Sequence, residues 1–187
     1  MEKTKVLILT YYWPPAGGAG VQRWLKFVKY LSKLNYDIHA YTPENPEAPA
    51  VDLSLMDEIP ENITVIKKAI WEPFAYYKKL TKKKGAFNAG FLSEESNDKQ
   101  SWTEKISMYI RANVFVPDAK MFWIKPSIRF LNKYIREEDI PIIISSGPPH
   151  SLHIIAREIK RKNAIKWLAD FRDPWTNIDF YKDLPMS

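Results

Sequence analysis

Residues 5–31 read KVLILTYYWPPAGGAGVQRWLKFVKYL, and this stretch decides the fold class. Residues 6–10 are a short apolar run typical of a buried strand, and residues 11–20 are rich in proline and glycine. Apolar residues then recur at intervals of three and four, which predicts a helix with one buried face. These apolar positions are Val21, Trp24, Leu25, Val28 and Leu31. A strand, a ligand loop and a helix in this order are typical of a phosphate site.

The loop contains three glycines, Gly17, Gly18 and Gly20, which are the candidate phosphate-binding positions. Glycine allows positive φ and a close approach of ligand to backbone, and N–H groups in the first turn of a helix favour an anion. Arg23, in or near that turn, predicts a further phosphate contact. The alternative interpretation is a glycine turn that only lets the strand and the helix pack closely.

The loop does not match a dinucleotide-binding fingerprint. That fingerprint has a third glycine where this chain has Arg23, a shorter entry, and an acidic residue at the end of the second strand. Here the second predicted strand, residues 36–41, runs into Thr42 and Pro43. The sequence therefore disfavours a dinucleotide site.

The composition fits one domain over residues 1–187 better than two. The chain is 45% hydrophobic and has no cysteine, which excludes disulfides, cysteine-bound metal and a thiol nucleophile and suits the cytoplasm. Its first apolar run is too short for a signal peptide or a membrane span. We expect a protein that is soluble or peripheral at the membrane.

The basic charge is concentrated in one segment. The chain carries a formal net charge of +6, and residues 67–84 hold seven lysines and one acid, Glu72, or 7 − 1 = +6. Lysines interleaved with aromatic side chains are typical of anionic membrane surfaces. The alternative is a solvated helix end with buried aromatic residues. The candidate membrane-surface residues are Lys67, Lys68, Trp71, Lys78, Lys79, Lys82, Lys83 and Lys84.

Strands and helices alternate along the rest of the chain, which predicts an α/β fold with a Rossmann-like, doubly wound, mainly parallel sheet. Residues 43–62 are interpreted as an irregular surface excursion and residues 85–100 as a flexible insertion. Further strands are predicted near residues 63–70, 140–144 and 167–169, and helices near residues 102–112, 128–135 and 152–159.

Three loops should meet at one edge of this sheet, because parallel strands place their carboxyl ends together. The loops are the glycine loop, residues 145–151 (SSGPPHS) and residues 170–175 (DFRDPW). Their polar residues suit sugar hydroxyls and phosphate. The candidate catalytic residues on the sugar or acceptor side are His150, Asp170, Arg172 and Asp173.

Each of these residues also has a structural interpretation. His150 can simply cap a helix, Asp170 and Arg172 can form an ion pair at the strand end, and Pro174 can mark a turn. His153 is interpreted as a surface residue of a helix turn. The three histidines are too dispersed to predict a metal site.

Together, residues 5–31, 41–46 (YTPENP), 144–156 (ISSGPPHSLHIIA) and 169–181 (ADFRDPWTNIDFY) resemble the N-terminal half of retaining family 4 glycosyltransferases with the GT-B fold, of the bacterial cell-surface polysaccharide type. The resemblance implies transfer of a sugar from a nucleotide-sugar donor to a glycan or lipid-linked acceptor, without metal or other cofactor. It also implies that Gly17 and Gly18 approach the donor diphosphate with support from Arg23, while His150 and residues 170–173 line the sugar or acceptor side.

Members of this family continue into a second, C-terminal domain that binds the nucleotide sugar, and this chain ends at Ser187. We therefore expect a domain that folds but hardly transfers sugar alone, located in the cytoplasm or at the inner face of the membrane. A non-catalytic module that binds an anionic glycan or membrane surface is the alternative. Nucleic-acid binding is disfavoured, since the lysines are bunched and no known nucleic-acid motif accompanies them.

Overall fold

The computed structural model describes residues 3–44, 46–48, 50–71 and 116–174. Five strands form one sheet in the order β3-β2-β1-β4-β5, and all four neighbouring pairs are parallel. The strands are β1 (Thr4–Leu9), β2 (Tyr36–Pro43), β3 (Thr64–Lys68), β4 (Ile142–Gly147) and β5 (Lys166–Phe171). The predicted parallel α/β sheet is confirmed.

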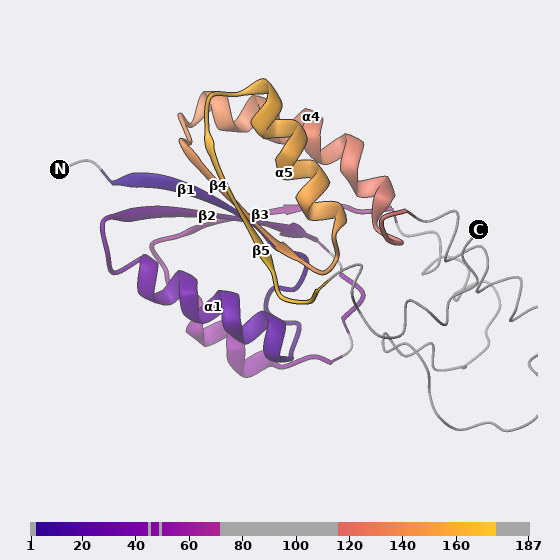
Figure 1. Cartoon of the computed structure of the whole chain (residues 1–187). Coiled ribbons are helices and arrows are strands. Elements are labelled where there is room, and N and C mark those ends of the chain that lie inside the picture. Colours follow the sequence, from indigo (N-terminus) through magenta and orange to yellow (C-terminus); the bar gives the residue numbers. More distant parts are fainter. Residues whose placement is uncertain (1–2, 45, 49, 72–115, 175–187) are drawn as a thin grey trace, which may run out of the picture.

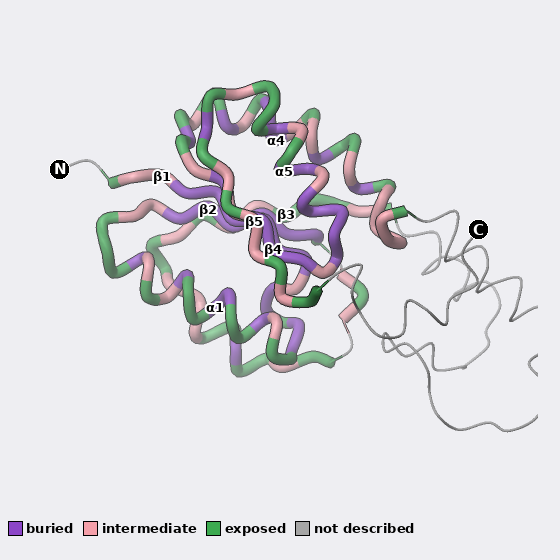
Figure 2. The backbone as a smooth tube through the Cα atoms, viewed as in Figure 1, coloured by how far each residue is buried: buried purple, intermediate pink, exposed green. Residues whose placement is uncertain are grey.

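Helices cover both faces of the sheet (Figure 1), so the fold is doubly wound. Helix α1 (Ala19–Leu31) lies on one face, and α4 (Ile124–Glu137) and α5 (Ser151–Lys162) lie on the other. Successive side chains of β1 point to opposite faces of the sheet, as in any strand. Val6 and Ile8 join the α1 core, whereas Leu7 and Leu9 join the core beneath α4 and α5. Buried residues therefore follow the central strands (Figure 2).

Strand β4 is displaced from the predicted residues 140–144. Ile140 is buried, but its N–H donates to the carbonyl of Ile135, so it belongs to the turn that ends α4. Ser145 and Ser146, which the sequence places in a loop, continue the strand pairing opposite Ala169 and Asp170. Both β4 and β5 therefore extend further toward the candidate site than predicted.

The predicted irregular excursion over residues 43–62 is partly ordered against the fold. It contains the 3-10 helix η1 (Leu53–Glu58), whose Leu55 is buried in the α1 core. A second short 3-10 helix, η2 (Met121–Trp123), leads into α4. The predicted insertion at 85–100 and the predicted helix at 102–112 lie outside the described residues.

Candidate functional site

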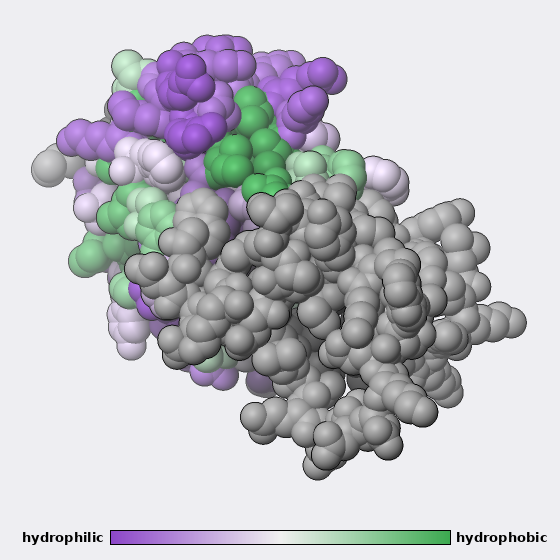
Figure 3. Space-filling view, turned by 45° about the vertical axis from the view of Figure 1, so that its right-hand side comes forward, coloured by the Kyte–Doolittle hydropathy of each residue, from purple (hydrophilic) through white to green (hydrophobic). Residues whose placement is uncertain are grey.

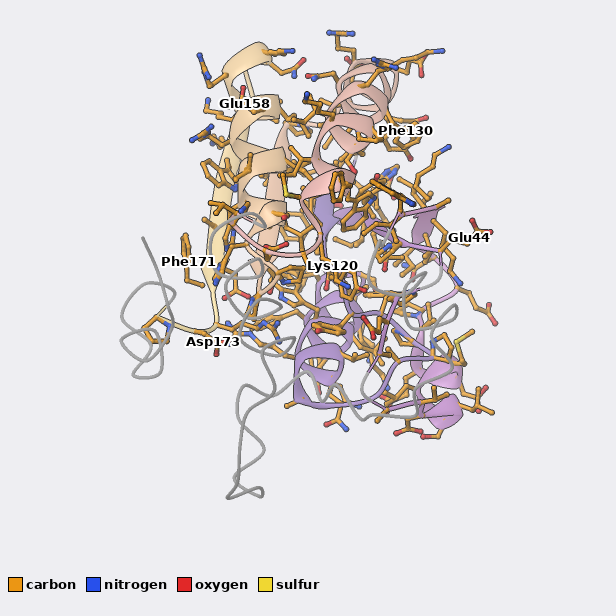
Figure 4. All side chains as sticks on the ribbon, turned by 90° about the vertical axis from the view of Figure 1, so that its right-hand side faces the viewer. Glu44, Lys120, Phe130, Glu158, Phe171 and Asp173 are labelled. Atoms are coloured by element: carbon orange, nitrogen blue, oxygen red, sulfur yellow. The ribbon has the colours of Figure 1, made fainter. Side chains whose placement is uncertain are left out.

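The three predicted loops meet at the carboxyl edge of the sheet, where β1, β4 and β5 end side by side. Figure 4 looks toward this edge, with Phe171 and Asp173 below α5 and Lys120 between the α4 and α5 layer and α1. Direct contacts join all three loops. Arg23 and Trp24 of α1 reach Asp170 of β5, and Arg172 reaches the β4 loop.

The glycine loop is held by the segment that follows β2. The Gly17 N–H donates to the Ala50 carbonyl at 2.9 Å, and the Asp52 N–H donates to the Pro15 carbonyl at 2.8 Å. Gly18 precedes α1 with φ 106° and ψ 166°, a conformation that is essentially restricted to glycine. The loop therefore needs glycine at position 18 for its backbone conformation. The N–H of Gly17 already donates a hydrogen bond within the protein.

Gly20 has a different role, because it makes room for Arg172. A Cβ at position 20 would overlap the guanidinium of Arg172. That guanidinium donates from Nη2 to the Pro148 carbonyl at 2.8 Å and from Nε to the Gly147 carbonyl at 3.2 Å. Arg172 is thus fixed between the β4 loop and the first turn of α1.

Asp170 does not pair with Arg172, so the interpretation of these two residues as an ion pair is wrong. Its carboxylate accepts from Arg23 Nη2 at 2.7 Å, from Trp24 Nε1 at 3.1 Å and from Ser146 Oγ at 2.8 Å. The Asp170 side chain is only 11% exposed. Three donors in a nearly buried position make Asp170 a link between α1, β4 and β5.

The start of α1 favours an anion. Among the described residues, no side chain caps the helix at Gly18, and the first turn contains no acidic residue. Gly18 and Ala19 are exposed, and the Arg172 guanidinium lies beside Gly20. The N–H groups of a helix N-terminus and a guanidinium both attract negative charge, so this surface suits phosphate or carboxylate.

His150 and His153 flank Gly147 from the start of α5. A Cβ on Gly147 would lie 2.6 Å from His153 Nε2 and 2.9 Å from His150 Nδ1. The predicted surface position of His153 is wrong, because the residue is buried and its Nδ1 lies 2.8 Å from Ser145 Oγ. Burial lowers the pKa of His153 to about 4, with His150 adding to the effect. Burial also lowers the pKa of His150, so both imidazoles are neutral at pH 7.

His150 occupies the N-cap position of α5, but its side chain makes no capping hydrogen bond. Asp118 caps the helix instead. Its Oδ2 accepts from the Ser151 N–H at 2.7 Å, and its Oδ1 accepts from Ser151 Oγ at 2.6 Å. Asp173 is exposed just beyond β5 and, with Asp118, opposes the lowering of the His150 pKa.

The sequence did not single out Asp118, and it placed Trp24 only on the buried face of a helix and Ser146 only within the loop 145–151. Asp118 lies 33 residues before the helix that it caps, and Ser146 and Trp24 are linked to Asp170 across 24 and 146 residues. No local pattern signals such contacts.

Of the candidate membrane-surface residues, Lys67, Lys68 and Trp71 are described and exposed. Lys68 Nζ lies 4.3 Å from the centroid of the Phe130 ring. The remaining candidates, Lys78, Lys79, Lys82, Lys83 and Lys84, lie outside the described residues.

Two open hollows in the described part of the chain lie away from this edge. One, of about 320 Å³, lies between the end of α1 and residues 57–62, and the other, of about 420 Å³, lies between the ends of α4 and α5. Within the described ranges, no three histidine or acidic residues gather as a metal site would require. None of the described helices has the length and apolar character needed to cross a membrane.

No protein-family model and no curated protein matches this chain. Similar solved structures include a glycosyltransferase from Rickettsia africae, with 11% identity and a TM-score of 0.47 over 98% of this chain and 33% of that one. Another is Phytolacca americana UGT2 complexed with UDP-2fluoro-glucose and pterostilbene, with 13% identity and a TM-score of 0.48 over 91% and 31%.

The chain is also similar to the C-terminal domain of a hydrogenase from Pyrococcus furiosus, with 14% identity and a TM-score of 0.44 over 91% of this chain and 93% of that one. It therefore spans about a third of the Rickettsia and Phytolacca structures and nearly all of the hydrogenase domain. At these identities the assignment of the fold class rests on the sheet order itself.

Proposed function

We propose that this chain is the acceptor-side domain of a retaining glycosyltransferase that acts in bacterial cell-surface polysaccharide synthesis. The donor is a nucleotide sugar, the acceptor is a glycan or lipid-linked hydroxyl, and the reaction takes place at the cytoplasmic side of the membrane. One observation carries the proposal. Three of the four segments that resemble family 4 glycosyltransferases, residues 5–31, 144–156 and 169–181, converge on one anion-favouring edge, through the contacts of Asp170 and Arg172.

In the proposed reaction, the acceptor hydroxyl oxygen forms a bond to the anomeric carbon, and the bond from that carbon to the diphosphate oxygen breaks. The electron pair leaves with the nucleoside diphosphate, and the hydroxyl proton passes to a base. Stabilising the departing diphosphate is then the main task of the site. The α1 N-terminus and Arg172 supply positive electrostatic potential, Gly18 leaves the backbone open, and Gly20 makes room for the Arg172 guanidinium.

The contacts of the candidate residues support different proposed roles. Arg172 is the best-placed phosphate ligand, because it is held by two carbonyls beside the start of α1. Asp170 already accepts three hydrogen bonds, so it acts as a positioning residue rather than as a base. The exposed Asp173 can accept a hydrogen bond from a sugar hydroxyl, whereas His150 is buried and neutral at pH 7.

The test is a titration of the chain with UDP, GDP, UDP-glucose and inorganic phosphate, followed by heteronuclear NMR. We expect nucleotide-dependent shifts at residues 17–23, 147–150 and 170–173. Arg172→Ala should weaken nucleotide binding at least about 10-fold, because a charge-assisted hydrogen bond is lost. Arg136→Ala removes the same charge at the far end of α4 and should leave binding unchanged.

Three outcomes would contradict the proposal. Shifts outside the three loops, or none with any nucleotide, would overturn the assignment of this edge to the donor phosphates. Inorganic phosphate binding as tightly as the nucleotides would favour the non-catalytic module that recognises an anionic glycan or membrane surface.

A further inference from the structure

Helix α4 presents a narrow basic strip to solvent. Lys125, Arg129, Lys133 and Arg136 are all exposed, and at 3.6 residues per turn they fall within an arc of about 80°. The strip is about 16 Å long, given the rise of a helix. The one acidic residue of α4, Glu137, lies at its end and pairs with Lys133 at 3.6 Å. The strip therefore keeps most of its positive charge.

Helix α5 adds to this charge. Together the two helices hold eight basic residues and two acidic ones, or 8 − 2 = +6, which equals the net charge of the whole chain. Both arginines of α5, Arg157 and Arg161, pair with Glu158. Figure 3 shows the hydrophilic area that covers this layer at the top of the molecule.

The basic strip ends in an exposed aromatic pair. Trp71 is 62% exposed and Phe122 37% exposed, and their rings meet edge to face with centroids 4.6 Å apart. Phe122 lies in η2, which runs directly into α4. This end of α4 therefore combines a row of cations with two aromatic rings that are in part accessible to solvent.

We propose that the outer surface of α4, with Trp71 and Phe122 at its N-terminal end, docks onto an anionic lipid bilayer. Basic side chains bind the headgroups of acidic lipids, while aromatic side chains insert at the level of the interface. A polynucleotide is a poorer fit. The edge-to-face contact of the two rings, with 67° between their planes, does not form a platform on which successive bases can stack.

This inference does not depend on the glycosyltransferase proposal, but it agrees with it geometrically. Trp123, just before α4, stacks on Tyr41 near the carboxyl end of β2 with centroids 5.2 Å apart. The aromatic end of the α4 surface therefore lies at the same edge of the sheet as the candidate site. Docking in this way would hold that edge close to the bilayer.

The test is sedimentation of the whole chain with vesicles of phosphatidylcholine, alone or mixed with phosphatidylglycerol. We expect binding to the acidic vesicles only, and less of it as salt rises. Each basic side chain near an acidic surface contributes roughly fivefold to partitioning, so Arg129→Glu with Lys133→Glu should reduce it at least about 25-fold. Trp71→Ala should weaken binding without changing its salt dependence.

The matched control is Lys3→Glu with Lys33→Glu, which makes the same charge change at exposed positions outside α4 and should retain most of the binding. Circular dichroism checks that both double variants fold. An equal loss in both, or equal binding to neutral vesicles, would overturn the proposal. Tighter binding to duplex DNA or RNA than to acidic vesicles would assign the surface to a polynucleotide. Because nucleotide binding is measured separately, failure here leaves the transferase proposal standing.

Discussion

Asp170 joins three segments of the chain through one carboxylate. Its partners come from α1 and β4, and none is closer than 24 residues in sequence. Two of the three donors, the Trp24 indole and the Ser146 hydroxyl, are on buried residues. Arg23, in contrast, has a side chain that is 46% exposed. The buried neutral donors should therefore matter more for stability than the ion pair.

We predict that Asp170→Ala lowers the free energy of unfolding by roughly 2–4 kcal/mol, because it leaves Trp24 and Ser146 without their acceptor in a buried place. Arg23→Ala should cost less than about 1 kcal/mol, as expected for an exposed ion pair. Urea unfolding of both variants measures the difference. Asp170→Asn is the control, since its amide oxygen still accepts. Equal losses for Asp170→Ala and Arg23→Ala would show that the ion pair dominates.

At the scale of elements, α5 depends on a residue outside itself. The sequence suggests that the helix supplies its own cap at His150, yet Asp118 provides the capping bonds. Asp118 also accepts from the Lys120 N–H at 2.9 Å, so one carboxylate orders the approach to η2 and starts α5. This contact ties α4 and α5 together at the edge that carries the candidate site.

Asp118→Ala should lower the free energy of unfolding by about 1–2 kcal/mol, the usual effect of losing an N-cap. Asp118→Asn should retain most of that stability, because its amide oxygen caps as well. Hydrogen exchange at the Ser151 amide gives a local readout and should speed up in the alanine variant only. Unchanged exchange at Ser151 would mean that the cap does not hold the start of α5.

At the scale of the whole molecule, burial of His150 and His153 makes stability depend on pH. Their pKa values are lowered in the folded state, and that of His153 falls from 6.5 to about 4. Between these values the unfolded chain binds more protons than the folded one, so stability decreases as pH falls. For His153, the free energy of unfolding begins to decrease as pH falls below about 6.5. The decrease levels off below about pH 4, where the histidine is protonated in the folded state as well.

The slope should reach about 1.4 kcal/mol per pH unit for each histidine that stays neutral in the fold. Urea midpoints at a series of pH values from 7 downward measure it. His153→Asn is less stable at neutral pH because it loses packing, but it should show a shallower slope. Asp170 raises the pKa of His153, so Asp170→Asn should extend the loss of stability to lower pH. If the slope is unchanged in His153→Asn, the pH dependence of stability does not come from burial of His153.

The sequence by itself determined the fold class and the edge at which the loops meet. Hydrophobic periods of two and 3.6 residues, together with the glycine loop, predicted a parallel α/β sheet, and the structure confirms it. These features are predictable because each depends on residues close together in the chain. The positive φ of Gly18 is predictable for the same reason, since a loop that enters a helix commonly needs glycine there.

Only the tertiary structure decided which side chains meet. It paired Asp170 with Arg23 rather than Arg172, buried His153 beside Ser145, and gave the capping of α5 to Asp118. It also brought Trp71 onto Phe122 at the start of α4. The reason is that such contacts join residues from 8 to 147 positions apart, and their geometry depends on how helices pack across the sheet.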